Sequence, residues 1–212
     1  QPRGSLMLIG VGGSGRQSLT RLACAMRGIE CFRIALTRGY GLSEFSEDIK
    51  KLCGRAGVEG KHVCFLLSDS EIVAESFLEV VNSLLNSGEV PGLYNDEEMA
   101  QVLNDMRPVA QALEIPETPD NCMRLFLNRV RANLHVVLAV SPVGKTLRAR
   151  CLKFPSLVNC CTIDWFDRWP EEALRSVAHH FVGEMDVGAA ELVAASSAAA
   201  AAAAAGEPGA QA

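Results

Sequence analysis

The sequence predicts an α/β domain in which helices cover both faces of a parallel β-sheet. Short apolar runs alternate along the chain with segments whose apolar residues have helical spacing. The run 62–67 is apolar at almost every position, as is typical of a parallel strand that is buried on both faces. A glycine-rich loop between the first strand and the first helix completes the pattern of a phosphate-binding α/β domain.

Each element follows from a local signal. The predicted strands are 6–9, 31–36, 62–67, 135–140 and 159–163. The predicted helices are 16–27, 43–54, 77–88, 96–106, 119–130, 145–150 and 170–181. Ser43 and Thr118 are the expected N-caps, because their hydroxyls can accept from the first free N–H groups of a helix. Pro108 is expected to interrupt the helix that precedes it.

The glycine-rich loop is the strongest functional signal. It reads Gly10-Val11-Gly12-Gly13-Ser14-Gly15-Arg16-Gln17-Ser18 and directly follows the first apolar run. Glycines allow a tight turn that directs several backbone N–H groups inward, and the N-terminus of the following helix adds a partial positive charge. We therefore expect these nine residues to form a nest for the phosphates of a nucleotide, together with Mg²⁺.

The loop departs from the usual pattern G-x-x-x-x-G-K-[ST] at three places. Arg16 stands where lysine is expected, Gln17 stands where Ser or Thr would hold Mg²⁺, and Ser18 comes one residue late. Arginine can still reach phosphate oxygens, as a planar fork instead of a compact charge. The alternatives are a loop that binds a nucleotide but turns it over poorly, and a glycine-rich turn without a ligand.

A second acidic site should follow the strand 62–67. Asp69 is the candidate Mg²⁺ ligand, and Glu71 is the nearest carboxylate that could orient an attacking water. Either Asp69 holds the metal and the base is missing, or Asp69 sits in the base position and Ser68 has replaced the metal ligand. A third possibility is that Asp69 only complements a helix N-terminus.

Three further polar residues are candidates for the same site. Ser141 follows the strand 135–140, where a side chain would lie near a γ-phosphate, although it can also be a simple loop serine. Arg148 or Arg150 could reach a neighbouring subunit's nucleotide as an arginine finger, with a solvated surface arginine as the alternative.

Composition limits the other functions. The net charge of −5 gives no basic footprint for nucleic acid, and no apolar run reaches the ~18 residues that a membrane span needs. The eight cysteines form no C-x-x-C pair, so we expect reduced core thiols and no zinc site. We divide the chain into a domain over 1–186 and an alanine-rich, low-complexity tail over 187–212.

Several segments together resemble the fourth AAA+ module of axonemal dynein heavy chains. The resemblance covers about Leu6 to Met185, and it is carried by the segments 10–23, 39–41, 47–52, 77–91, 133–138, 141–144 and 154–166. The segment from Phe154 to Phe166 is highly specific. The chain is thus similar to a piece of a much longer motor, without the small helical lid that follows such a module.

The resemblance implies a five-stranded P-loop AAA+ core with strand order 5-1-4-3-2 in a ring of six modules. It implies binding of ATP or ADP with Mg²⁺, and neighbouring modules of the same heavy chain as partners. Through the parent motor it implies intermediate and light chains, microtubules, and a place in the cytoplasm, the cytoskeleton and the ciliary axoneme. Arg16 and the segment Ser68-Asp69-Ser70 put hydrolysis in doubt more than binding.

Three functions follow as hypotheses. The first is a nucleotide-binding, regulatory module with slow or no hydrolysis. The second is a structural module of the ring whose site is empty or permanently filled. The third is a P-loop phosphotransferase with its own small substrate, which is weaker because no lid or acceptor site is visible.

Overall fold

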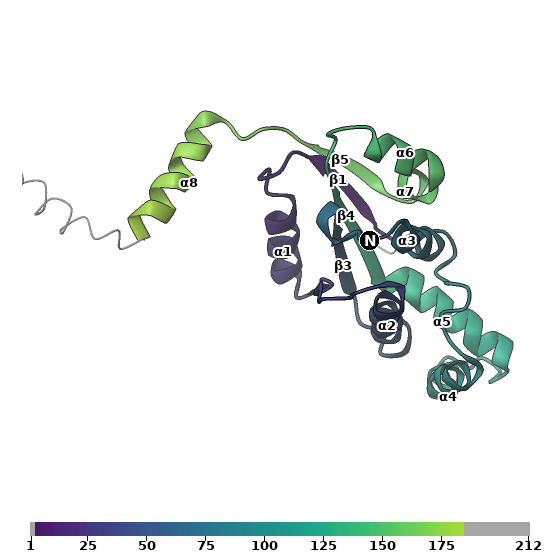
Figure 1. Cartoon of the computed structure of the whole chain (residues 1–212). Coiled ribbons are helices and arrows are strands. Elements are labelled where there is room, and N and C mark those ends of the chain that lie inside the picture. Colours follow the sequence, from purple (N-terminus) through teal and green to yellow (C-terminus); the bar gives the residue numbers. More distant parts are fainter. Residues whose placement is uncertain (1–2, 185–212) are drawn as a thin grey trace, which may run out of the picture. The chain divides into compact units, whose positions relative to one another are not determined.

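A computed structural model describes residues 3–184 and shows a five-stranded, all-parallel sheet (Figure 1). The strands are β1 (Leu6–Gly10), β2 (Glu30–Phe32), β3 (Val63–Ser68), β4 (Leu134–Val140) and β5 (Thr162–Phe166). Their spatial order is β2-β3-β4-β1-β5, with parallel pairing at every contact. This order confirms the predicted one, read from the opposite edge, and the fold is consistent with a P-loop AAA+ core.

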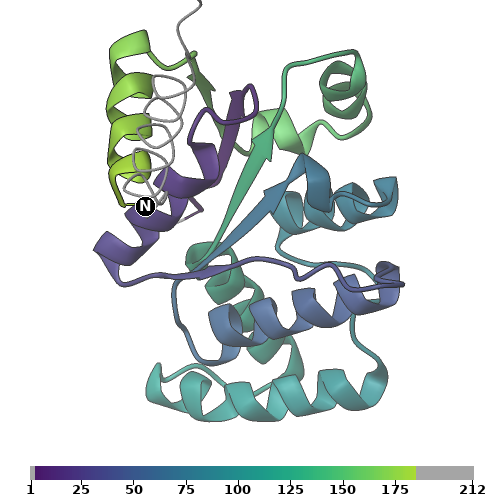
Figure 2. The same cartoon turned by 60° about the vertical axis from the view of Figure 1, so that its left-hand side comes forward.

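Helices cover both faces of the sheet. In sequence order, the helices beside the sheet's unit are α1 (Arg16–Arg27), α2 (Leu42–Cys53), α3 (Glu75–Ser87), α4 (Asp96–Ala112), α5 (Pro119–Asn133), α6 (Thr146–Lys153) and α7 (Ser156–Asn159), with a π-turn η1 (Gly54–Val58) and a 3₁₀ turn η2 (Asp69–Glu71). A further helix, α8 (Glu171–Glu184), follows later in the chain. Figures 1 and 2 show α1 on one face and α2, α3 and α5 on the other. Because both faces are covered, the continuous apolar pattern of β3 and β4 is explained: β3 is buried at every residue.

The chain divides into two units, Gln1–Arg168 and Trp169–Ala212. The first unit holds the sheet and α1 to α7, and the described part of the second is mainly the amphipathic helix α8, which exposes Leu174 and Phe181. The predicted boundary at residue 186 and the alanine-rich tail lie outside the described residues. Within the described residues, no helix is long and apolar enough to cross a membrane.

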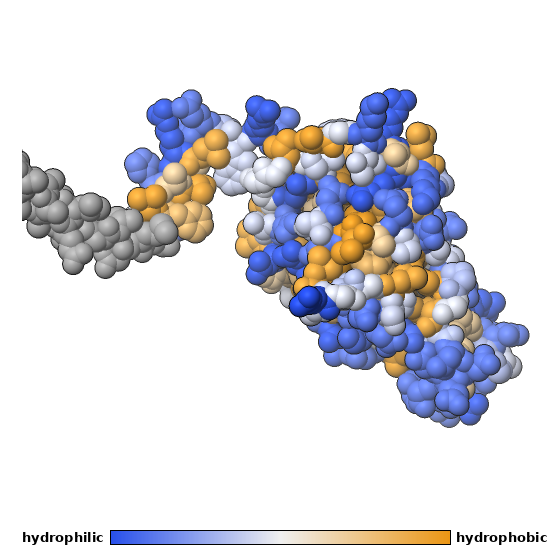
Figure 3. Space-filling model, viewed as in Figure 1, coloured by the Kyte–Doolittle hydropathy of each residue, from blue (hydrophilic) through white to orange (hydrophobic). Residues whose placement is uncertain are grey.

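The aromatic core lies between the sheet and the helices α2 and α3. Phe45, Phe65 and Phe77 are fully buried, and the rings of Phe45 and Phe77 stack with centroids 4.2 Å apart. A smaller cluster, formed by Leu8, Cys24, Cys64, Leu66, Val137 and Ala139, lies on the other face. The space-filling view shows hydrophilic side chains gathered over α4, while apolar patches remain elsewhere on the same face (Figure 3).

Two predictions about helices were wrong. Ser43 is not the N-cap of α2; Gly41 is, and its N–H donates to the Glu44 carboxylate. Pro108 lies inside α4, because it is exposed and removes one N–H from the solvent side while Met106 and Ala110 anchor the other side in the core.

The edge strands also differ from the prediction. The strand expected over 31–36 stops at Phe32, the last residue paired with β3, and the next residue, Arg33, donates to Glu71. The strand expected over 159–163 starts three residues later, at Thr162, because α7 occupies the chain up to Asn159. Edge strands have neighbours on one side only, so their apolar pattern is weaker and their ends are harder to predict.

A pair of histidines joins the amino ends of β3 and β4. His135 Nδ1 donates to the carbonyl of Gly4 at 2.9 Å, so in its neutral form its Nε2 accepts from His62 Nδ1 at 3.1 Å. Burial lowers the pKa of His135, and the neighbouring His62 acts in the same direction.

We expect the stability of the chain to fall as the pH drops below about 6.5, the ordinary pKa of histidine. The unfolded chain then binds a proton at His135 that the folded chain resists, and protonated His135 can no longer accept from His62. Urea midpoints at pH 7.5, 6.5 and 5.5 test this, with His135→Gln as the control that should flatten the profile. If the urea midpoint depended on pH equally in the parent chain and in His135→Gln, His135 would not be the cause of the loss of stability.

Candidate functional site

The glycine-rich loop forms an open cradle between β1 and α1. Gly13 and Gly15 adopt left-handed backbone angles, with φ of 78° and 87°, which side chains other than glycine rarely adopt. Gly15 is the N-cap of α1 and no side chain caps the helix, so its first N–H groups are available to an anion. A depression of about 330 Å³ lies over this loop and is lined by residues 12–18.

Arg16 connects the loop to the neighbouring strand. Its guanidinium donates to the carbonyl oxygens of Val140, at the end of β4, and of Val11, in the loop, the latter at 3.3 Å. The positive charge therefore lies at the carboxyl edge of the sheet, beside the opening of the loop. Both partners of the guanidinium are main-chain carbonyls. Among the ion pairs of the described residues, none involves Arg16, so its charge has no carboxylate partner there.

Asp69 links the ends of β3 and β4. One carboxylate oxygen accepts from the backbone N–H of Ser141, and the other pairs with the guanidinium of Arg150 at 3.0 Å. Arg150 also pairs with Glu75 at 3.2 Å. The structure thus brings Asp69, Ser141 and Arg150 together, next to the Val140 carbonyl that Arg16 contacts.

Glu71 is engaged elsewhere. It is 5% exposed, and its carboxylate accepts from the N–H and hydroxyl of Ser68, both at 2.7 Å, and from Arg33 at 2.7 Å. Ser68 and Glu71 therefore form a capping box on the turn η2. These contacts direct Glu71 toward the end of β2 and occupy both of its oxygens.

The remaining predicted residues lie around the depression or beyond it. Gln17 is half-buried and Ser18 is exposed, and both line the depression. Arg148 is exposed on α6, whereas Arg150 is held within the module by its two carboxylate partners. The two arginine-finger candidates thus differ: Arg148 can reach outward, and Arg150 would have to break ion pairs.

The residues of the loop fit a bound phosphate group. The Ser14 hydroxyl is buried inside the loop and has no hydrogen-bond partner there. A buried hydroxyl without a partner is costly unless a ligand or water satisfies it. Added Cβ atoms at Gly12 and Gly13 would meet nothing within 4 Å, so the space above the loop is open. When Mg²⁺ is bound, Gln17 and Asp69 are the residues that would hold it and neutralise phosphate charge.

Gly10 and Gly12 provide a matched pair of substitutions. A Cβ at Gly10 would lie 2.8 Å from Phe166 Cβ and 2.8 Å from Ser14 Oγ, whereas one at Gly12 would meet nothing. We expect Gly10→Ala to push β5 and the loop apart and to lower stability by about 1–3 kcal/mol, as overpacking does. Gly12→Ala should change stability by less than about 1 kcal/mol. Thermal melting of both variants tests this; equal melting temperatures would show that the loop yields at Gly10.

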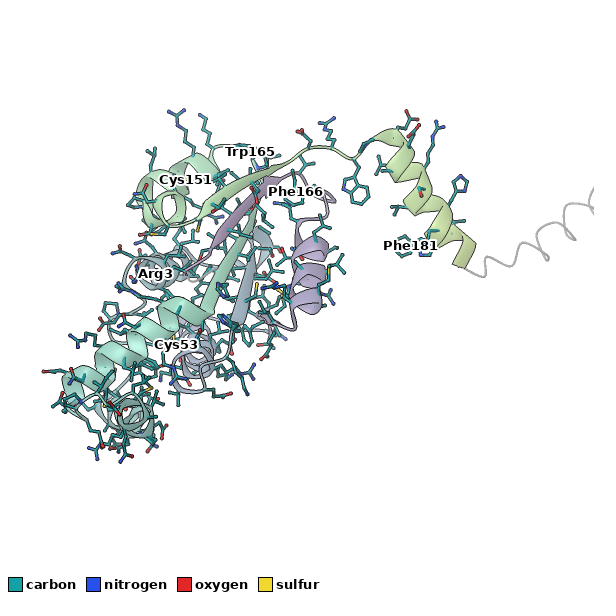
Figure 4. All side chains as sticks on the ribbon, turned by 180° about the vertical axis from the view of Figure 1, so that it is seen from behind. Arg3, Cys53, Cys151, Trp165, Phe166 and Phe181 are labelled. Atoms are coloured by element: carbon teal, nitrogen blue, oxygen red, sulfur yellow. The ribbon has the colours of Figure 1, made fainter. Side chains whose placement is uncertain are left out.

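Two features of the site were not predicted from the sequence. Arg33 donates hydrogen bonds to the Glu71 carboxylate, and Arg150 donates one to the Asp69 carboxylate. Neither pairing has a spacing signal, because the partners are separated by 38 and 81 residues and are brought together only by the sheet order. Figure 4 shows Trp165 and Phe166 on β5, at the edge of the sheet beside β1.

The eight cysteines are free thiols, as expected. Burial raises the pKa of the Cys53 thiol to about 12, so it stays protonated within the core. The sulfur atoms of Cys24, Cys31 and Cys64, however, all lie within 4.8 Å of one another. Among the described residues, this is the one group of three or more metal-binding side chains at such spacing, and the sequence analysis did not anticipate it.

Comparison with known proteins agrees with the geometry. The family described as "P-loop containing dynein motor region D4" matches residues 1–205. The chain is 52% identical to dynein axonemal heavy chain 6 of Homo sapiens over 91% of its own length, and 51% identical to dynein axonemal heavy chain 1 of Mus musculus over 87%. It is 50% identical to the dynein-1-beta heavy chain of the flagellar inner arm I1 complex of Chlamydomonas reinhardtii over 91%.

These relatives are far longer than the chain, which spans only 4% to 5% of their length. About half of the residues are identical across nearly the whole chain. The five-stranded parallel sheet and the loop after β1 agree with this similarity. The chain belongs to the family of P-loop containing dynein motor region D4 domains of axonemal heavy chains.

Proposed function

We propose that the chain is a nucleotide-binding module of an axonemal dynein heavy chain, which takes ATP or ADP with Mg²⁺ and hydrolyses ATP slowly or not at all. The observation that carries this proposal is the open cradle of residues 12–18, with an uncapped helix N-terminus and a buried, unpartnered Ser14 hydroxyl. In this proposal the backbone N–H groups of the loop hold the phosphates, and Arg16 turns from the two carbonyls to phosphate oxygens.

Slow hydrolysis follows from the carboxylates near the loop. Both oxygens of Asp69 are used by Ser141 and Arg150, and Glu71 is buried against Ser68 and Arg33. Glu71 is therefore saturated and cannot orient a water molecule, whereas Asp69, with one hydrogen bond on each oxygen, keeps lone pairs for the role of a Mg²⁺ ligand. No further carboxylate is then left in this proposal to orient the attacking water. Losing such acid–base assistance costs about 10²–10⁴ in rate. In this proposal Asp69 faces the nucleotide, and the backbone N–H of Ser141 holds the Asp69 carboxylate in place. Glu71 has a structural role.

The partners we propose are those of the parent motor. The relatives are axonemal heavy chains, one of them from a flagellar inner arm, which supports a place in the ciliary axoneme and work on microtubules. Exposed Leu22, Met26 and Trp165 give the module apolar surface that neighbouring modules of the heavy chain can cover. Intermediate and light chains would act through other parts of the same motor.

Equilibrium binding of a fluorescent ATP analogue tests the proposal. Because the depression over residues 12–18 is open, we expect a dissociation constant in the micromolar range or weaker, on the scale of about −8 kcal/mol. Unlabelled ATP or ADP should compete, and EDTA should weaken the binding. Absence of binding at millimolar nucleotide would favour the second candidate, a structural module with an empty site. Nanomolar affinity would contradict the open-site argument.

A further inference from the structure

Three cysteines from separate elements meet on the face of the sheet that α1 covers. Cys24 comes from α1, Cys31 from β2 and Cys64 from β3, and Cys31 and Cys64 are register partners on adjacent parallel strands. Their sulfur atoms all lie within 4.8 Å of one another. No two of them are close in the sequence in the manner of a zinc motif, so only the fold brings them together.

The spacing of the sulfurs matches what a thiolate-bound metal needs. In a tetrahedral site with metal–sulfur bonds of about 2.3 Å, neighbouring sulfurs lie ~3.8 Å apart. The sulfurs here would have to move together by ~1 Å at most, which is within reach of small rotations about their Cα–Cβ bonds. Sulfur is the donor that thiophilic ions such as Zn²⁺ and Cd²⁺ select.

The surroundings suit a site with three protein ligands and one open position. Cys24 and Cys64 are buried, at 7% and 4% exposure, whereas Cys31 is only half-buried, so an ion and a water molecule can enter from its side. Leu8, Leu66 and Val137 belong to the same apolar cluster and keep other ligands out. Burial raises the pKa of the Cys31 thiol, and Arg21, on α1, opposes that rise only weakly, so the bound divalent ion itself supplies the positive charge that stabilises three thiolates.

We propose that Cys24, Cys31 and Cys64 form a binding site for a thiophilic divalent metal ion of the Zn²⁺ and Cd²⁺ class. Three thiols lose their protons, three metal–sulfur bonds form, and no electron is transferred. The bound ion ties α1, the helix that begins at Arg16, to β2 and β3. This site is independent of the nucleotide, because its ligands lie under α1 and not in the loop of residues 12–18.

The test is a titration of the reduced 212-residue chain with Cd²⁺, in the presence of a phosphine reductant, read by the sulfur-to-cadmium charge-transfer absorbance in the ultraviolet. We expect one tight equivalent per chain and a melting temperature that rises with Cd²⁺, since the ion binds the folded state. Cys64→Ala should weaken the affinity at least about 10- to 100-fold, the loss that removing even an outer partner of a metal ligand causes.

Cys122→Ala is the matched control, because Cys122 is equally buried but lies on α5, on the opposite face of the sheet. The double variant Cys160→Ser and Cys161→Ser controls for the adjacent pair of half-buried thiols. Both controls should bind like the parent chain. If Cys64→Ala does not fold, Cys31→Ala, at the half-buried position, gives the same comparison. Failure of the parent chain to bind one equivalent, unchanged binding in the trio variants, or equal losses in the controls would overturn the proposal.

Discussion

Replacing Arg16 with alanine should weaken binding of an ATP analogue about 10- to 100-fold. A charge-assisted hydrogen bond contributes about 1.5–3 kcal/mol, and each 1.4 kcal/mol corresponds to a factor of ten in affinity. Arg16 begins α1 and is the cationic side chain that lines the depression over the loop. Within residues 3–184 its guanidinium donates to two main-chain carbonyls and forms no ion pair, so it can turn to phosphate oxygens without breaking one.

Arg16→Lys is the matched control for this prediction. Lysine keeps the charge as a compact ammonium, so the lysine variant should retain most of the affinity. Titration calorimetry measures both, and melting curves check that loss of the contact with Val140 has not unfolded the loop. Parent-like affinity in a folded Arg16→Ala chain would show that the backbone alone holds the phosphates.

Replacing Phe45 with alanine should cost about 3–5 kcal/mol of the free energy of unfolding, which is a large share of the ~5–15 kcal/mol of a typical domain. Phe45 on α2 is fully buried, stacks on Phe77 and lies 6.3 Å from Phe65 on β3. Its ring therefore joins the helices α2 and α3 to strand β3, and alanine would leave a cavity among three aromatic positions.

Phe181→Ala is the control for the core substitution. Phe181 is 61% exposed on α8, and its truncation should change stability by less than about 0.5 kcal/mol. Urea unfolding curves measure both free energies. A loss below about 1 kcal/mol for Phe45→Ala would mean that the core closes over the missing ring.

The central strands and the loop could be predicted from the sequence because each carries its own local signal. The apolar run that became β3 is buried at all its residues, and helix α1 begins at Arg16 and ends before Gly28, as the pattern indicated. Glycine at a left-handed C-cap and a continuous apolar strand are determined by neighbours in the sequence. The strand order came from resemblance to a family, since no local signal specifies it.

The contacts of the acidic residues could not be predicted in the same way. Glu71 has the spacing of a candidate base, yet the fold gives it Arg33 as a partner and buries it. Arg150 has the position of an arginine finger, yet it pairs with Asp69. The trio of Cys24, Cys31 and Cys64 is invisible in the sequence for the same reason. Each of these arrangements depends on which strands are neighbours, and on where side chains turn at the strand ends.

The most direct test of whether this module binds ATP but hydrolyses it slowly is single-turnover release of phosphate, measured after the chain has been saturated with ATP. The cradle of residues 12–18 predicts that ATP binds, and the engaged carboxylates of Asp69 and Glu71 predict that it stays largely intact. The expected rate is far below about one per second, the lower end of ordinary enzyme turnover. Phosphate release near one per second, or no ATP binding at all, would contradict it.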